Sequence, residues 1–239
     1  MSLSNADDKA TLDAMPHAAS SAARVPGSWP YTPIEEWRHA LTHGVTAALA
    51  VAGLFALLIR ARERAGSGVA FGVYGLALIL VFSSSAIYHR FSHTKAHRWL
   101  EFCDHTAIFI MIAGTYTPIV ALGLPEPLRG RMLILMWGFA AGGIAFKTFS
   151  FAKGFEDKLR TVSVLLYLIM GWLGLSILPA LIRHLSPNAL LWLGVGGVLY
   201  TIGALIYSMR RIPHGHLIWH LFVMGASACH FVAIFAYLI

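Results

Sequence analysis

The chain has 239 residues, of which 57% are hydrophobic and only 12% are charged, about half the usual quarter. With a mean hydropathy of +0.67, this composition excludes an ordinary soluble domain and predicts a polytopic membrane protein. The net charge of +7 is not gathered into a basic face that could follow a nucleic acid backbone, so we expect no nucleic acid partner and basic loops that face anionic lipid.

Residues 1–33 are rich in Ala, Ser, Pro and Asp without hydrophobic periodicity, which predicts a mobile N-terminal tail. Residues 34–239 are expected to form one transmembrane domain. Crossing a bilayer takes about 20 residues. Six runs without Lys, Arg, Asp or Glu suit that length: 40–59, 65–88, 105–125, 161–182, 189–209 and 217–239. A shorter run, 132–146, becomes a seventh span if Lys147 extends toward the membrane surface and the helix continues through Phe151. The sequence therefore predicts an all-α integral membrane protein, a seven-helix bundle.

The basic residues in the loops predict how this bundle is oriented. If the N-terminus is cytoplasmic, the inside segments hold eleven Lys and Arg residues and the outside segments six, although Arg60, Arg62 and Arg64 oppose this trend. We therefore expect the N-terminus in the cytoplasm and the C-terminus outside. No apolar segment precedes the first span, so that span is expected to act as the insertion signal.

Nine of the twelve histidines lie near helix ends that this topology brings to the cytoplasmic face: His39, His43, His89, His93, His97, His105, His214, His216 and His220. His216 and His220 are four residues apart, so both imidazoles lie on one helical face with the spacing that offers two nitrogens to one metal ion. His89, at the end of the second span, is the predicted third ligand. The role of His230, deeper in the last span, is left open.

Other polar residues are expected at the same depth. Ser85 lies one turn before His89. Asp104 begins the third span, and a carboxylate there would be costly against lipid, so it should face the bundle interior, unless it acts as a helix cap. Glu36, His39 and His43 form one stripe on the first span. Glu36 and His43 are expected to be partners of the ligands, while His39 and His43 also form a pair that suits a second, weak metal site.

Four segments together resemble a known family: E-E-W-R-H-A-L-T-H (35–43), S-A-I-Y-H (85–89), D-H (104–105) and H-L-I-W-H-L-F-V-M-G-A-S-A-C-H (216–230). This set is similar to the hemolysin III branch of the progestin and adipoQ receptor family, which includes the adiponectin receptors and is similar to the alkaline ceramidases. The resemblance implies zinc held by His89, His216 and His220, a zinc-bound water held by Asp104 with Ser85 nearby, and a location in the bacterial inner membrane. The family usually has Asn where this chain has His39, which leaves the role of that position open.

Three neutral imidazoles and an open fourth position are typical of catalytic zinc. The resulting hypothesis is a zinc-dependent hydrolase that acts on a lipid amide or ester, with the water activated by zinc and oriented by Asp104 and Ser85. The substrate class is implied by the ceramidase resemblance alone. The alternative is a non-catalytic receptor-like or membrane-homeostasis protein with a structural zinc. A membrane lipid is the expected substrate or ligand in either case.

Overall fold

The computed structural model describes residues 31–209 and 212–238. The predicted tail therefore lies almost wholly outside the described residues, as do Arg24, Arg210 and Arg211 of the charge comparison. Within the described part, seven helical segments are long and apolar enough to cross a membrane, and no strand is present. The prediction of an all-α seven-helix membrane protein is confirmed, whereas the orientation of its ends in the membrane remains a prediction.

The helices follow the predicted spans, with clear end signals at several places. They are α1 (Pro33–Arg60), α2 (Ser67–Arg90), α3 (His97–Gly123), α4 (Leu128–Lys153), α5 (Arg160–Trp172), α6 (Leu178–His184), α7 (Pro187–Ser208) and α8 (Gly215–Tyr237), with short 3₁₀ segments η1 (Ala61–Glu63) and η2 (Leu173–Ile177). The short run at 132–146 is indeed part of a full span, α4, which passes Lys147 and Phe151 before it ends at Gly154 in a left-handed conformation.

The first helix begins seven residues before the predicted charge-free run. Thr32 caps it, because its hydroxyl accepts from the Glu35 backbone N–H while the Glu35 side chain accepts from the Thr32 backbone N–H, and Pro33 occupies the first helical position. Residues 34–37, which precede the predicted charge-free run, thus form the first turn of α1. As a result, Glu36 and His39 belong to a rigid helix.

The uniform apolar run at 161–182 predicts one continuous helix, but the fifth span is interrupted. It consists of α5, η2 and α6 in succession. Pro179, in the first turn of α6, has no backbone N–H to continue the preceding ladder. At the break, the Tyr116 hydroxyl donates to the Gly171 carbonyl at 2.6 Å and accepts from the Gly174 backbone N–H at 2.7 Å. Backbone groups that the break leaves free are therefore satisfied by α3.

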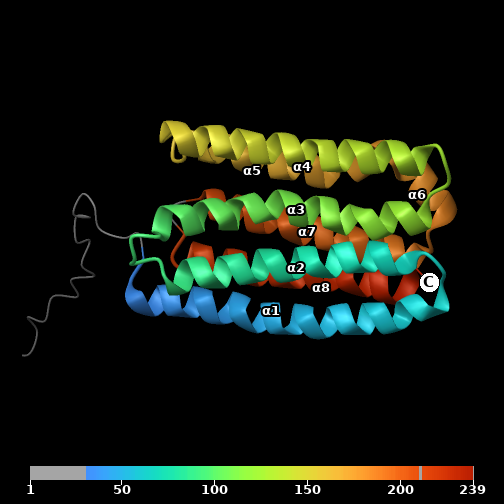
Figure 1. Cartoon of the computed structure of the whole chain (residues 1–239), viewed down its shortest axis with the longest axis horizontal. Helices are drawn as coiled ribbons and strands as arrows, with labels where there is room; N and C mark the ends of the chain where they lie inside the picture. Colours follow the sequence, from blue (N-terminus) through green and yellow to red (C-terminus); the bar gives the residue numbers. More distant parts are fainter. Residues whose placement is uncertain (1–30, 210–211, 239) are drawn as a thin grey trace, which may run out of the picture. The chain divides into compact units, whose positions relative to one another are not determined.

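The seven spans are arranged in two layers. In Figure 1, α1, α2, α3 and α4 lie side by side in chain order, and α8, α7 and α5 lie behind them. Contacts of α8 with α1, α3 and α7 close the bundle, and its core is filled by Phe71, Tyr74, Phe82, Phe109 and Met136. Large apolar side chains such as Phe55, Ile134 and Leu191 are exposed on the outer surface, as expected for helices that face lipid. Because successive spans are antiparallel, the start of α1, the end of α2 and the starts of α3 and α8 meet at one end of the bundle (Figure 1).

Candidate metal centre

His89, near the end of α2, is fixed by a carboxylate from α1. Its side chain is buried, and its Nδ1 lies 2.7 Å from Oε2 of Glu36. A carboxylate at this distance accepts a hydrogen bond from the Nδ1–H group, which leaves the lone pair on Nε2 free. This is the arrangement that commonly orients a histidine toward a metal ion.

His216, in the first turn of α8, meets His89 across the bundle. The two Nε2 atoms are 3.1 Å apart. Two nitrogens bound tetrahedrally to one zinc ion, each at about 2.0–2.1 Å, lie about 3.3 Å from one another. The separation therefore fits two ligands of a single ion.

His220 lies one turn further along α8, with its ring 4.7 Å from that of His216 and 5.0 Å from that of His89, measured between centroids. Its Nδ1 is 3.1 Å from the hydroxyl oxygen of Thr42 on α1. That hydroxyl already donates to the His39 carbonyl oxygen at 2.9 Å, so it accepts from Nδ1 of His220. The Nε2 of His220 is then the free acceptor of a neutral imidazole.

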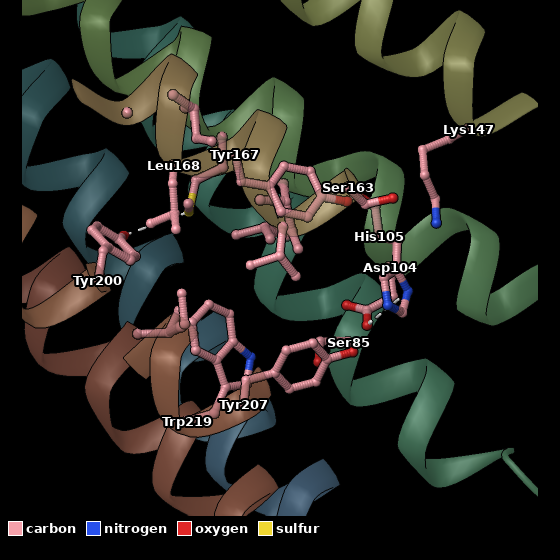
Figure 2. Close-up of a pocket in the computed structure, with 18 of the residues that line it drawn as sticks. Ser85, Asp104, His105, Lys147, Ser163, Tyr167, Leu168, Tyr200, Tyr207 and Trp219 are labelled. Atoms are coloured by element: carbon pink, nitrogen blue, oxygen red, sulfur yellow. Dashed lines mark hydrogen bonds and ion pairs between the residues drawn. The ribbon is translucent and has the colours of Figure 1, made fainter. Parts of the chain in front are cut away.

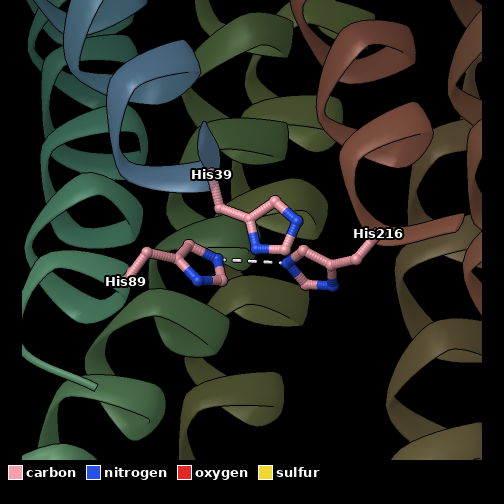
Figure 3. Close-up of side chains that lie close together, drawn as sticks. All are labelled: His39, His89 and His216. Atoms are coloured by element: carbon pink, nitrogen blue, oxygen red, sulfur yellow. Dashed lines mark hydrogen bonds between the residues drawn. The ribbon is translucent and has the colours of Figure 1, made fainter. Parts of the chain in front are cut away.

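Helix α1 also supplies an imidazole to this group, that of His39. Ligand atoms of His39, His89 and His216 all lie within 4.8 Å of one another, and Figure 3 shows the three rings converging from α1, α2 and α8. This group contains two of the three predicted ligands, His89 and His216, and adds His39, which the sequence pairs with His43 instead. The third predicted ligand, His220, lies beside the group by its ring centroid but is not one of the three residues that meet this distance. The available signal for His39 was its position three residues after Glu36, on the same face of α1.

The donor set of this centre fits a borderline transition metal such as zinc. All four candidate ligands are imidazoles, the preferred nitrogen donors of zinc, copper and nickel. Within the described residues, Nδ1 of His39 is buried and has no hydrogen-bond partner. A buried imidazole nitrogen normally finds a partner, so this unpaired atom in a cluster of histidines is consistent with a metal site.

Beside the histidines lies a second polar group, formed by Ser85, His43 and Asp104. The Ser85 hydroxyl is 2.8 Å from Nδ1 of His43 and also interacts with the Asp104 carboxyl group. The His43 ring stacks on that of His220, with centroids 3.6 Å apart and planes within 7°. Asp104 thus faces the interior as predicted, and His43 lies between Ser85 and the ring of His220.

These polar groups line one end of an internal cavity of about 170 Å³, whose walls come mainly from α3, α5, α7 and α8 with side chains of α1, α2 and α4. Figure 2 shows Ser85, Asp104 and His105 at this end and Leu168 and Tyr200 further along the walls. The remaining walls are mainly apolar, with side chains such as Ile112, Met111 and Val223. The polar end of the cavity is therefore continuous with an apolar chamber inside the bundle.

Charged residues surround the cavity near the same end of the bundle: Arg98, Glu101, Lys147, Glu156, Asp157 and Arg160. Arg98 donates to Glu156 at 2.7 Å and to the Phe151 carbonyl oxygen. Burial alone would raise the pKa of Glu156, but a backbone hydrogen bond and Arg98 lower it by more, so this carboxylate stays ionised. Lys147 is buried and points toward the cavity rather than the membrane surface (Figure 2), unlike the extended lysine expected from the sequence.

The other histidines lie outside this centre. His93 is exposed in the connection between α2 and α3. His230 is further along α8, where its Nε2 donates to the Leu193 carbonyl oxygen at 3.1 Å and its ring packs on Gly196. A methyl group at Gly196 would approach the ring to 2.3 Å, so glycine is needed for this contact. His230 thus joins α7 to α8 and borders the cavity.

Comparison with known proteins relates this chain to one family along most of its length. A family model described as haemolysin-III related matches residues 31–231. Hemolysin-3 of Bacillus cereus is 38% identical over 207 residues, which cover 86% of this chain and 92% of that protein. Monocyte to macrophage differentiation factor of Homo sapiens is 32% identical over 225 residues, 90% of each chain. The adiponectin receptor protein of Drosophila melanogaster is 23% identical over 215 residues, 82% of this chain and 48% of that protein. The chain therefore belongs to the haemolysin-III-related family and is a seven-helix protein of the bacterial cell membrane.

Proposed function

We propose that this protein is a zinc-dependent hydrolase of a lipid amide or ester. The observation that carries the proposal is the cavity, because it joins the histidine cluster, Ser85 and Asp104 to an apolar chamber within the membrane domain. A site for a small polar substrate would not need such a chamber. An acyl chain would gain about 0.8 kcal/mol for each CH₂ group that it transferred from water to these walls.

His89, His216 and His220 are the ligands that we assign to the zinc ion. When bound, zinc would supply a Lewis acid for a carbonyl oxygen and lower the pKa of a water molecule at the site to about 7. Glu36 holds His89 through Nδ1, and Thr42 holds His220 through Nδ1, so both rings keep their free nitrogen toward the centre. The protein thus contributes to zinc binding by holding neutral imidazoles in a fixed orientation.

Asp104 is the group that we assign to proton transfer. It lines the polar end of the cavity, where it can accept a proton from an attacking water and return it to the leaving amine or alcohol. Ser85, held between His43 and Asp104, is placed to orient the same water or the carbonyl oxygen. The apolar chamber holds the acyl chain and keeps bulk water from the reacting carbonyl.

One observation favours the alternative, a non-catalytic protein in which zinc ties helices together. His39 is a fourth imidazole in the group, and structural zinc sites are closed by four protein ligands. Under this alternative, Asp104 and Ser85 would have no role in chemistry.

The two functions are separated by Asp104→Asn, with Glu63→Gln as a matched control. Glu63 lies in η1, just beyond the opposite end of α1, where it pairs with Arg60. Purified proteins are incubated with a ceramide and with a phospholipid in mixed micelles, and fatty acid release is followed by mass spectrometry. We expect Asp104→Asn to keep its zinc and lose about 10²–10⁴-fold in rate, and the control to match the wild type. Equal rates in all three proteins, or no release by any, would contradict the proposal.

A further inference from the structure

The position of His39 has a consequence for the metal centre itself. On α1, His39 lies between two residues that each form a hydrogen bond with a different histidine of the group. Glu36, three residues earlier, bonds His89 of α2, and Thr42, three residues later, bonds His220 of α8. These two contacts fix the rotation of α1 and turn the face that carries His39 toward the centre.

The rings lie around one point rather than in a row. Centroids are separated by 4.6 Å from His39 to His216, 4.9 Å from His39 to His89 and 5.2 Å from His39 to His220. The distances from His89 to His216 and to His220 fall in the same range, at 4.9 and 5.0 Å. His39 is therefore as close to the three assigned ligands as they are to one another, measured between ring centroids.

His39 has a nitrogen that the surrounding protein does not satisfy. The side chain is only 2% exposed, and its Nδ1 is buried without a hydrogen-bond partner among the described residues. Leaving such a group unpaired destabilises the folded protein. A metal ion shared with His89 and His216, whose ligand atoms lie within 4.8 Å, would give this nitrogen a partner.

We propose that His39 is a fourth protein ligand, so that the resting centre consists of four imidazoles from α1, α2 and α8. The inference uses the metal-binding half of the proposed function and adds to it. A shell of four protein ligands closes the position that a reacting molecule needs. His39 must then leave the metal, or the coordination number must rise to five, before a substrate carbonyl can bind. The centre is thereby held closed by α1, the helix that also carries Glu36 and Thr42.

The proposal is tested by counting imidazoles on the zinc ion in the detergent-purified full chain. X-ray absorption at the zinc edge is measured for the wild type, His39→Asn and the control His93→Asn, which removes an exposed histidine from the α2–α3 connection. We expect four imidazoles in the wild type and in the control, and three in His39→Asn, with zinc affinity at least tenfold lower in that variant. Three imidazoles in the wild type, unchanged by His39→Asn, would overturn the proposal.

A second variant gives a positive signal that does not depend on loss of binding. In His39→Cys loaded with Co²⁺, a thiolate ligand at this position produces a sulfur-to-cobalt charge-transfer band in the near ultraviolet, whereas His93→Cys does not. Absence of the band from a folded, cobalt-loaded His39→Cys protein would exclude His39 as a ligand.

The outcomes also separate this inference from the proposed hydrolysis. Four imidazoles without lipid hydrolysis in any variant would uphold the ligand and refute the enzyme. Lipid hydrolysis by a wild-type protein with three imidazoles on zinc would support the enzyme and refute His39 as a ligand. If both hold, His39→Asn opens the centre and should hydrolyse lipid faster than the wild type at saturating zinc.

Discussion

At the residue scale, the centre depends on side chains that hold histidines rather than on the histidines alone. Glu36 and Thr42 each fix one imidazole through its Nδ1, across a helix interface. Because a metal ion requires the free nitrogen of a neutral ring, these partners determine which nitrogen is presented. Their loss should therefore weaken metal binding without removing a ligand.

Glu36→Gln tests this dependence. A neutral amide accepts a weaker hydrogen bond from Nδ1 of His89 than the carboxylate does, so zinc affinity should fall about 10–100-fold. The measurement is a competition titration with a chromogenic chelator. Glu35→Gln is the control, because Gln also completes the capping box with Thr32. Equal affinities in the two variants would show that Glu36 does not support the centre.

Part of this residue-level arrangement could be predicted from the sequence. The i, i+4 spacing of His216 and His220 and the placement of His89 at a helix end were enough to predict that these rings converge, and the structure brings them together. The place of His39 was not predicted, because it depends on the rotation of α1 about its axis. That rotation is set by contacts between helices, which no local pattern in the sequence specifies.

At the scale of elements, the apolar runs were sufficient to predict every span, since the membrane requires length and apolarity of any helix that crosses it. The predicted ends of the spans were less accurate where charged residues occur inside a helix. Glu35, Glu36 and Arg38 had moved the predicted first span to 40–59, although Thr32, Pro33 and Glu35 form a recognisable helix start. The break at η2 could not be predicted from hydropathy, because the run around it is uniformly apolar.

Close helix contacts depend on glycine at a few positions. A methyl group at Gly114 of α3 would lie 2.5 Å from Cβ of Ala77 on α2, and neither backbone can move aside easily. We expect Gly114→Ala to destabilise the folded state by about 1–3 kcal/mol, the usual cost of overpacking. Thermal unfolding in detergent is the measurement. Gly142→Ala on α4, where no atom lies within 4 Å, is the control and should unfold like the wild type.

At the scale of the whole molecule, the cavity could not be predicted from the sequence. It is lined by side chains from all seven spans, many of them far apart in the chain, and its volume depends on how these side chains pack. The composition and the number of helices are equally compatible with a bundle that has no internal cavity. The orientation of the bundle in the membrane remains a prediction from the loop charges.

The role of the apolar chamber is tested by filling it. Leu168 lines the cavity (Figure 2), whereas its neighbour Ile169 is exposed on the outer surface of the bundle. Leu168→Trp should reduce hydrolysis of long-chain substrates at least tenfold, because the indole occupies the space of the acyl chain, while short-chain analogues and zinc content are little affected. Ile169→Trp should behave like the wild type. An equal loss for short and long chains would indicate that the chamber does not hold the acyl chain.

The central claim is that α2 and α8 share a metal ion through His89, His216 and His220. It is tested most directly by the metal content of protein purified in detergent without chelators, measured by mass spectrometry for the wild type, His89→Ala and His220→Ala. The account predicts about one zinc per chain in the wild type and a clearly lower zinc content in both variants, because each variant loses one of the imidazoles that hold the ion. No metal in the wild type, or a full complement in both variants, would contradict it.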